Sequence, residues 1–291
     1  MTTISASMVK ELRERTGLGM MECKKALQNA NGDMEQAIDD LRKASGLKAA
    51  KKASRVAAEG IVLTKIAEDG NYGVIVEVNS ETDFVAKDDN FLDFAGKVVD
   101  QAFTQREADL PTLMEAGLEE LREALVQKIG ENITVRRLDR LAFDNANQGI
   151  IESYVHNNNQ IAVLIALQGG DEALARDIAM HVAALNPMVV RREDVPEEVL
   201  AKESEIYSAQ ARESGKPAEI IGKMIDGRLR KFVAEVTLLE QPFVKDPDTK
   251  VSDLLKEAGA DIVTFVRYAV GDGIEKEEED FAAEVAAQIN G

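Results

Sequence analysis

A chain of 291 residues is long enough for about two domains, and its 45% hydrophobic and 30% charged content is typical of a globular protein. Its formal net charge of −18 argues against non-specific binding to the phosphate backbone of nucleic acids. The single cysteine excludes an intrachain disulfide. The absence of an apolar signal region and of any run near about 20 apolar residues predicts a cytoplasmic protein that does not enter a membrane.

Residues 1–56 are predicted to form a three-helix domain followed by a basic linker. Ser5 or Ser7 can cap the first helix, and the second helix runs from about Met20 to Asn29. This part of the chain carries 11 Lys or Arg against 7 Asp or Glu. The basic run at residues 48–56 could bind RNA, but a solvated, partly helical tether to the acidic body is the favoured interpretation.

The next part of the chain contains an internal repeat, which divides it into residues 57–142 and residues 143–270. Each unit reads as a β-hairpin, one or more helices and a returning strand. Such a unit forms a sheet with helices on one side, so we expect an α+β fold with two repeated sheet-plus-helix subdomains. The strands are expected to begin near Gly60, Tyr72 and Ile133 in the first unit and near Gly149, Ile161 and Ile262 in the second.

The second unit is longer than the first by roughly 40 residues between its first and last strands, which indicates an insertion. Residues 193–235 fit this insertion, because they contain two helical patterns separated by the turn Ser214-Gly215-Lys216-Pro217. The narrow apolar stripes suggest a protruding helical hairpin. A hairpin lying on the sheet explains them as well.

Residues 271–291 are predicted to form a C-terminal helical module. A short amphipathic helix is expected from Asp280 to Ile289, with Phe281 and Val285 on its apolar side. The acidic run that precedes it complements the dipole at the helix N-terminus. Such a helix can dock on its own core or bind a partner.

Motifs for catalysis are missing from the sequence, which contains neither a phosphate-binding glycine loop nor a dinucleotide fingerprint. His181 lies in an apolar helical pattern and is expected to be structural. His156 precedes the predicted turn Asn157-Asn158-Asn159 and is expected to be exposed. These observations favour a binding protein over an enzyme, with no catalytic, cofactor or metal-binding residue.

The pentapeptide Thr82-Asp83-Phe84-Val85-Ala86 joins a strand-like apolar run to an acidic helical segment. A bulky aromatic beside an acid at such a junction can wedge into another protein. The alternative is a helix cap, in which Thr82 or Asp83 accepts backbone N–H bonds and Phe84 packs inward.

The rest of the chain favours the wedge. With Leu12-Arg13-Glu14-Arg15-Thr16-Gly17 and Met20-Met21-Glu22-Cys23-Lys24-Lys25-Ala26-Leu27, the sequence closely resembles the bacterial translation elongation factor Ts family. Ile129-Gly130-Glu131-Asn132 and Gln241-Pro242-Phe243-Val244 support the resemblance, which extends over essentially the whole chain. The resemblance implies a guanine-nucleotide exchange factor that binds the GTPase elongation factor Tu. It also implies a ubiquitin-associated fold for the first three helices, and self-association through the hairpin in some members.

The resemblance further implies that Phe84, with Asp83 beside it, enters the nucleotide domain of the GTPase and disturbs its Mg²⁺ and phosphate site. Met20 and Met21, with Arg13 nearby, would meet the same domain. The second unit would reach another domain, and the terminal helix would wrap back. The predicted partner-binding residues are Arg13, Met20, Met21, Thr82, Asp83, Phe84, Val85, Ile129, Gly130, His156, Phe281 and Val285.

Two other functions stay open from the sequence. The first is an adaptor or chaperone whose core displays the N-terminal domain. The second is a Mg²⁺-dependent hydrolase that uses the carboxylates of Asp83, Asp88 and Asp89.

Overall fold

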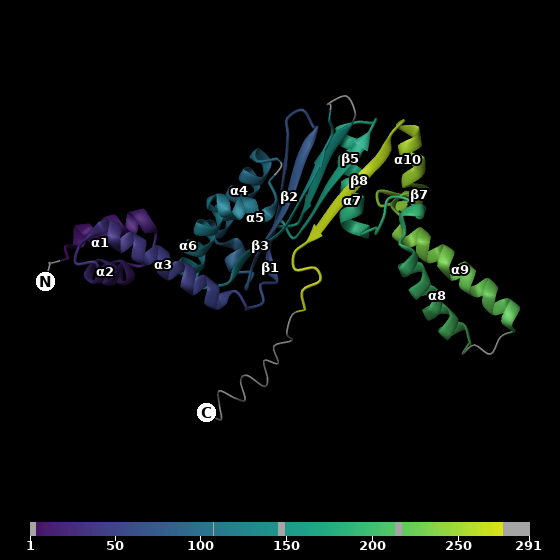
Figure 1. Ribbon diagram of the computed structural model, residues 1–291. Helices are drawn as coiled ribbons and strands as arrows, with labels where there is room; N and C mark the ends of the chain where they lie inside the picture. The colour runs from purple at the N-terminus through teal and green to yellow at the C-terminus, as the bar shows by residue number, and fades with distance from the viewer. Residues whose placement is uncertain (1–3, 107, 145–148, 213–216, 276–291) are drawn as a thin grey trace.

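The protein is elongated, with a helical domain at one end, packed sheets in the middle and a helical hairpin at the other end (Figure 1). The computed structural model describes residues 4–106, 108–144, 149–212 and 217–275. Its N-terminal helices and its two sheet-plus-helix units confirm the predicted α+β class. Within the described residues, no helix combines the length and the apolarity needed to cross a membrane.

The N-terminal domain consists of the three predicted helices, α1 (Ala6–Thr16), α2 (Met20–Asn29) and α3 (Met34–Lys52). The Ser5 side chain caps α1 by accepting a hydrogen bond from the backbone N–H of Met8. Gly17 ends α1 with a φ of 69°, a left-handed conformation that glycine adopts without strain. The small core of this domain is built from Val9, Leu12, Leu18, Cys23, Ala26, Leu27, Ala30, Ala37 and Leu41.

The predicted tether is partly helical, and Lys48, Ala50 and Lys51 are exposed in it, whereas Ala49 is buried. Residues 48–52 continue α3, which packs against α6 (Glu119–Ile129), and Ala49 is buried between them. The Lys52 ammonium also donates a hydrogen bond to the carbonyl of Gly130. Ala49 explains this arrangement, because its small side chain lets the two helices approach closely.

The first sheet has the order β1-β2-β3 and is antiparallel throughout. Helices α4 and α6 cover one of its faces, joined by α5 (Leu110–Leu113) and a short irregular turn, η2 (Met114–Leu118). Its strands are β1 (Glu59–Ile66), β2 (Tyr72–Ser80) and β3 (Ile133–Ala142), and its longest helix is α4 (Asp89–Thr104).

The second sheet repeats this pattern with the order β4-β5-β8 and is covered by α7. Its elements are β4 (Ile150–His156), β5 (Ile161–Gln168), α7 (Glu172–Leu185) and β8 (Asp261–Ala269). The insertion lies between α7 and β8, and its two helices, α8 and α9, project away from the sheets (Figure 1). It comprises η3 (Arg192–Asp194), α8 (Glu197–Arg212), α9 (Ala218–Val236), η4 (Leu238–Glu240), β6 (Pro242–Phe243), β7 (Asp246–Lys250) and α10 (Val251–Glu257).

The two sheets pack face to face, so each central strand is buried on both sides. Every residue of β2 is buried, as are residues 162–167 of β5. This explains why both strands are continuous apolar runs rather than alternating ones. The shared core between the sheets contains Val62, Ile75, Ile151, Ala162, Leu164, Ala166 and Tyr268.

Glu77 on β2 binds the chain at Gly271, just after β8, the last strand of the second sheet. Its carboxylate is fully buried and accepts hydrogen bonds from Arg136, from Arg137 and from the backbone N–H of Gly271. Burial by itself raises the pKa of Glu77, but the bonds from Gly271, Asn79 and Arg137 outweigh it and lower this pKa below 4.5. The helix predicted from Asp280 to Ile289 lies outside the described residues.

Candidate partner-binding site

The exposed ring of Phe84 is the centre of the candidate site. Phe84 follows β2 by four residues, and its side chain is 81% exposed. The next two residues, Val85 and Ala86, are buried in the core of the first unit. The interpretation in which Phe84 packs inward is therefore wrong. Helix α4 is capped by Asp88, which accepts from the N–H of Asn90, and not by Thr82 or Asp83.

Thr82, just after β2, is hydrogen-bonded to Glu131, just before the neighbouring strand β3. The backbone N–H of Thr82 donates to Glu131 Oε2 at 3.0 Å, and its hydroxyl donates to Oε1 at 2.7 Å. The same hydroxyl oxygen accepts a bond from the N–H of Val85 at 3.3 Å. The conformation of the turn that presents Phe84 is thus set from both ends.

The neighbouring residues Glu81 and Asn132 form a second hydrogen bond, in which the acceptor now lies beside β2 and the donor beside β3. Glu81 accepts from the backbone N–H of Asn132 at 2.5 Å, and it lies 3.5 Å from the guanidinium of Arg55. The register of the sheet explains why Glu81 meets Asn132 and why Thr82 meets Glu131. Ser80 pairs with Ile133 at the edge of the β2–β3 ladder, so the residues just beyond β2 lie opposite the residues just before β3.

Ile129 and Gly130 lie at the other side of this contact, where α6 ends. Gly130 adopts a φ of 90° and closes the helix through a bond from its N–H to the carbonyl of Val126. Ile129 packs against the core of the first unit. The structure therefore brings the motif of Phe84 and the motif of Gly130 into direct contact through Thr82 and Glu131, which are 49 residues apart in the sequence.

Asp83 faces Lys87 one helical turn later, at 2.7 Å. The hydrogen bond from Lys87 holds the pKa of Asp83 below its ordinary value of 3.8, so the carboxylate is charged at neutral pH. Asp88 is engaged in capping α4. The described part of the chain contains no group of three or more His, Cys, Asp or Glu side chains arranged to hold a metal ion.

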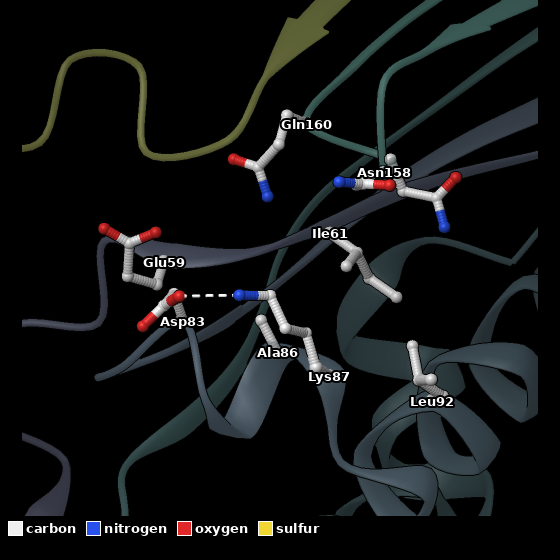
Figure 2. Close-up of a pocket in the computed structure, with 9 residues that line it drawn as sticks. Glu59, Ile61, Asp83, Ala86, Lys87, Leu92, Asn158 and Gln160 are labelled. Carbon is white, nitrogen blue, oxygen red and sulfur yellow. Dashed lines mark hydrogen bonds and ion pairs between the residues drawn. The ribbon is translucent and has the colours of Figure 1, made fainter.

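A hollow of about 510 Å³ adjoins this turn and separates it from the tip of the β4–β5 hairpin. Figure 2 shows the Asp83–Lys87 pair at one side of the hollow and the amides of Asn158 and Gln160 at the other. The two units meet here, because Val62 N–H donates to the carbonyl of Asn159 at 2.8 Å. The hollow is lined by Glu59, Ile61, Asp83, Ala86, Lys87, Leu92, Asn158, Asn159 and Gln160.

Met20 and Met21 form a second exposed apolar site at the start of α2. Their side chains are 60% and 76% exposed, and Arg13 on α1 is exposed as well. The next residue, Glu22, links this site to the core, because its carboxylate binds Lys48 of α3 and Gln127 of α6. Helix α6 thus supports both the methionine pair and the contact that holds Thr82.

His156 ends β4, where it is exposed as expected, and its Nδ1 lies 3.1 Å from the hydroxyl of Tyr154. By contrast, His181 is fully buried in α7 and bonded to Gln241 and Val244, which confirms its structural role. Phe281 and Val285 lie outside the described residues. The contribution of all these residues to binding stays a prediction.

Sequence reasoning missed the residues that hold the turn, Glu81 and Glu131. Glu131 lies inside a recognised motif and Glu81 directly precedes another, but a glutamate at the end of a strand or helix carries no distinctive pattern. The available signal was the pairing of β2 with β3, which places the flanking residues opposite one another once the register is known. Leu92, which is 39% exposed beside the hollow, was read only as part of the helix.

Comparison with known proteins shows what the whole chain is similar to. A family model described as Elongation factor TS matches residues 81–272. A protein from Hahella chejuensis named Elongation factor Ts is 66% identical over 291 residues, which is 100% of both chains. Proteins of the same name from Marinobacter nauticus and Saccharophagus degradans are each 61% identical, over 99% and 98% of this chain and 98% of either relative.

Proposed function

The chain belongs to the elongation factor Ts family and is a translation elongation factor, and we propose that it promotes GDP release from the GTPase elongation factor Tu. In this role the protein works by binding and not by catalysing a chemical reaction. We expect it to act in the cytoplasm, where elongation takes place. The observation that carries the proposal is the exposure of Phe84 on a turn whose backbone is fixed on both sides.

An exposed aromatic ring on a fixed turn suits insertion into a partner. Burying the ring would contribute roughly 1.5–3 kcal/mol from the hydrophobic effect. The turn is already ordered, so little conformational entropy is lost on binding. Asp83 would bring a negative charge close to the position that Mg²⁺ and the phosphates of the nucleotide must occupy. The inserted ring and the charge of Asp83 would both weaken the binding of the nucleotide.

Thermodynamic linkage turns this opposition into exchange. A factor that binds the nucleotide-free GTPase more tightly than the GDP complex must weaken GDP binding by the same ratio. It does not need to distinguish GDP from GTP, because the nucleotide present in excess then fills the empty site. The exposed Met20–Met21 pair would supply affinity at a distance from the nucleotide.

Stopped-flow release of a fluorescent GDP analogue from purified elongation factor Tu tests the proposal. Acceleration by this protein that is lost in Phe84→Ala supports both the function and the site. Acceleration that is indifferent to Phe84→Ala keeps the function and moves its origin to the other predicted contacts. Binding without acceleration would refute the exchange function and favour the adaptor alternative.

A further inference from the structure

We propose that Glu131 is a positioning residue for nucleotide exchange, because it fixes the turn that aims Phe84 at the partner. This inference rests on the proposed exchange function. Glu131 has no role among the predicted partner contacts. Its effect would pass through Thr82, two residues before the exposed ring.

The geometry at Thr82 is the first argument. Both carboxylate oxygens of Glu131 accept bonds from Thr82, one from its backbone N–H at 3.0 Å and one from its hydroxyl at 2.7 Å. Bonds to a charged acceptor are shorter and stronger than those between neutral groups. Two of them on one residue fix its backbone as well as its side chain.

The rigidity of the support is the second argument. Glu131 directly follows Gly130, which ends α6, and helix α6 is packed against α3 and the first sheet. The adjacent pair repeats the link in reverse, with Glu81 accepting from Asn132. Asn132 in turn donates its side-chain amide to the carbonyl of Arg55 at 2.8 Å. The turn is thereby attached to elements that pack against one another.

The exposure of Phe84 is the third argument. An 81% exposed ring has few contacts with its own protein that could orient it, so its direction depends on the backbone of the turn. On one side the backbone is held by the burial of Val85, and on the other side by the bonds from Thr82 to Glu131. If the bonds from Thr82 to Glu131 are lost, the ring of Phe84 stays exposed but its orientation is no longer fixed.

Removing the carboxylate should therefore separate the rate of exchange from binding. In Glu131→Ala, the maximal rate of GDP release should fall by about tenfold or more, since misaligned groups forfeit that much or more. The concentration of protein that gives half of this rate should change by less than about twofold, because contacts elsewhere supply the affinity. Glu131→Gln keeps the volume and one acceptor, so its effect should be intermediate.

A reporter at position 84 tests the positioning independently of exchange. The chain contains no tryptophan, so Phe84→Trp introduces a single indole. Its steady-state anisotropy should fall, and its quenching by acrylamide should rise, when Glu131→Ala is added. Glu115→Gln, an exposed glutamate that is remote from the turn in the sequence, is the matched control and should change neither signal. Unchanged anisotropy and quenching in the Glu131→Ala background would overturn the proposal.

A double variant decides whether Glu131 acts through Phe84. If it does, Glu131→Ala should slow exchange no further in a Phe84→Ala background. Independent, multiplying losses would contradict the proposal, as would a loss in half-saturating concentration alone. Far-ultraviolet circular dichroism and the thermal midpoint identify unfolding, in which case Glu131→Gln replaces Glu131→Ala. If the unmodified protein does not accelerate release, the proposed function fails, and the reporter still judges the positioning.

Discussion

Phe84 and Val85 are adjacent in the chain but have opposite environments. The ring of Phe84 is 81% exposed, whereas the side chain of Val85 is 9% exposed and packs in the core of the first unit. A single exposed apolar side chain is normal on a protein surface, so the proposed role of Phe84 depends on the fixed turn that presents the ring as well as on its exposure. Because Val85 must point inward, its neighbour is turned outward by the backbone of the same short helical turn.

This contrast predicts opposite outcomes for truncation at the two positions. Val85→Ala should lower the free energy of unfolding by roughly 1–3 kcal/mol, because it removes buried methyl groups. Phe84→Ala should change it by less than about 0.5 kcal/mol, since little buried surface is lost. It should nevertheless slow GDP release more than it weakens binding to the GTPase. Urea denaturation and stopped-flow release measure the two properties, and equal losses of rate and affinity would refute this division.

The methionine pair should contribute affinity with little effect on stability. Met21 is 76% exposed on α2, and Leu47 is 67% exposed on α3, so Leu47 provides a control of similar size and exposure. Met21→Ala should weaken binding to nucleotide-free elongation factor Tu by about 1 kcal/mol, whereas Leu47→Ala should not change it. Isothermal titration calorimetry distinguishes them. An equal loss in both variants would show that the effect is not specific to the α2 surface.

Most of the fold could be predicted from the sequence, because its repeated strands are long apolar runs with clear boundaries. Helix α6 was not recognised as a separate element, since Gly117, with a φ of 106°, interrupts the pattern just before it. The small β6–β7 hairpin and α10 were also missed. They are too short for hydrophobic periodicity to distinguish them from loops.

The candidate site was predicted less completely, because its residues depend on tertiary pairing. The local pattern located Phe84, and the family resemblance located Gly130, but neither located the contact between their segments. That contact follows from the pairing of Ser80 with Ile133, and the β-bulge between Glu77 and Val78 shifts this register by an amount that composition does not encode. In the alternative cap interpretation, Thr82 does accept a bond from the N–H of Val85, but Asp88, which lies closer to the start of α4, caps that helix.

His181 should make stability depend on pH. The N–H of Val244 donates to Nδ1 of His181 at 3.1 Å, so Nε2 carries the proton and donates to Gln241 Oε1 at 2.9 Å. Burial lowers the pKa of His181 below 6.5, although the bond to Gln241 opposes the shift. The unfolded chain therefore takes up a proton first as pH falls, and the folded state loses stability below about pH 6.5.

Urea denaturation at pH 7.5 and pH 5.5 measures this effect against the background of other groups. The decrease between the two should be smaller in His181→Gln than in the unmodified protein, by at most about 1.4 kcal/mol for each pH unit. His156→Gln, at an exposed strand end, should leave the decrease unchanged. A decrease of the same size in all three proteins would exclude His181 as its source.

Glu77 should be the most sensitive position for the attachment of the C-terminal segment. Its buried carboxylate joins Arg136 and Arg137 of the first sheet to the N–H of Gly271, which lies just beyond the second sheet. Removing one charge from a buried, hydrogen-bonded group of this kind costs about 3–5 kcal/mol, because the remaining charges stay desolvated. Glu77→Gln should therefore destabilise the core and speed hydrogen exchange at the Gly271 amide.

The pH dependence of this network has the same sign as that of His181 but a different cause, because hydrogen bonds rather than burial lower the pKa of Glu77. The pKa of Glu77 is lowered in the folded state, so its stabilisation is complete above about pH 4.5 and is lost as pH falls through the folded-state pKa. Glu77→Gln should remove that part of the acid sensitivity. Glu68→Gln, in the exposed turn between β1 and β2, makes the same chemical change and should leave stability and Gly271 exchange unaltered. If both variants behave alike in denaturation and in amide exchange, the carboxylate of Glu77 does not hold the two sheets and the C-terminal segment together.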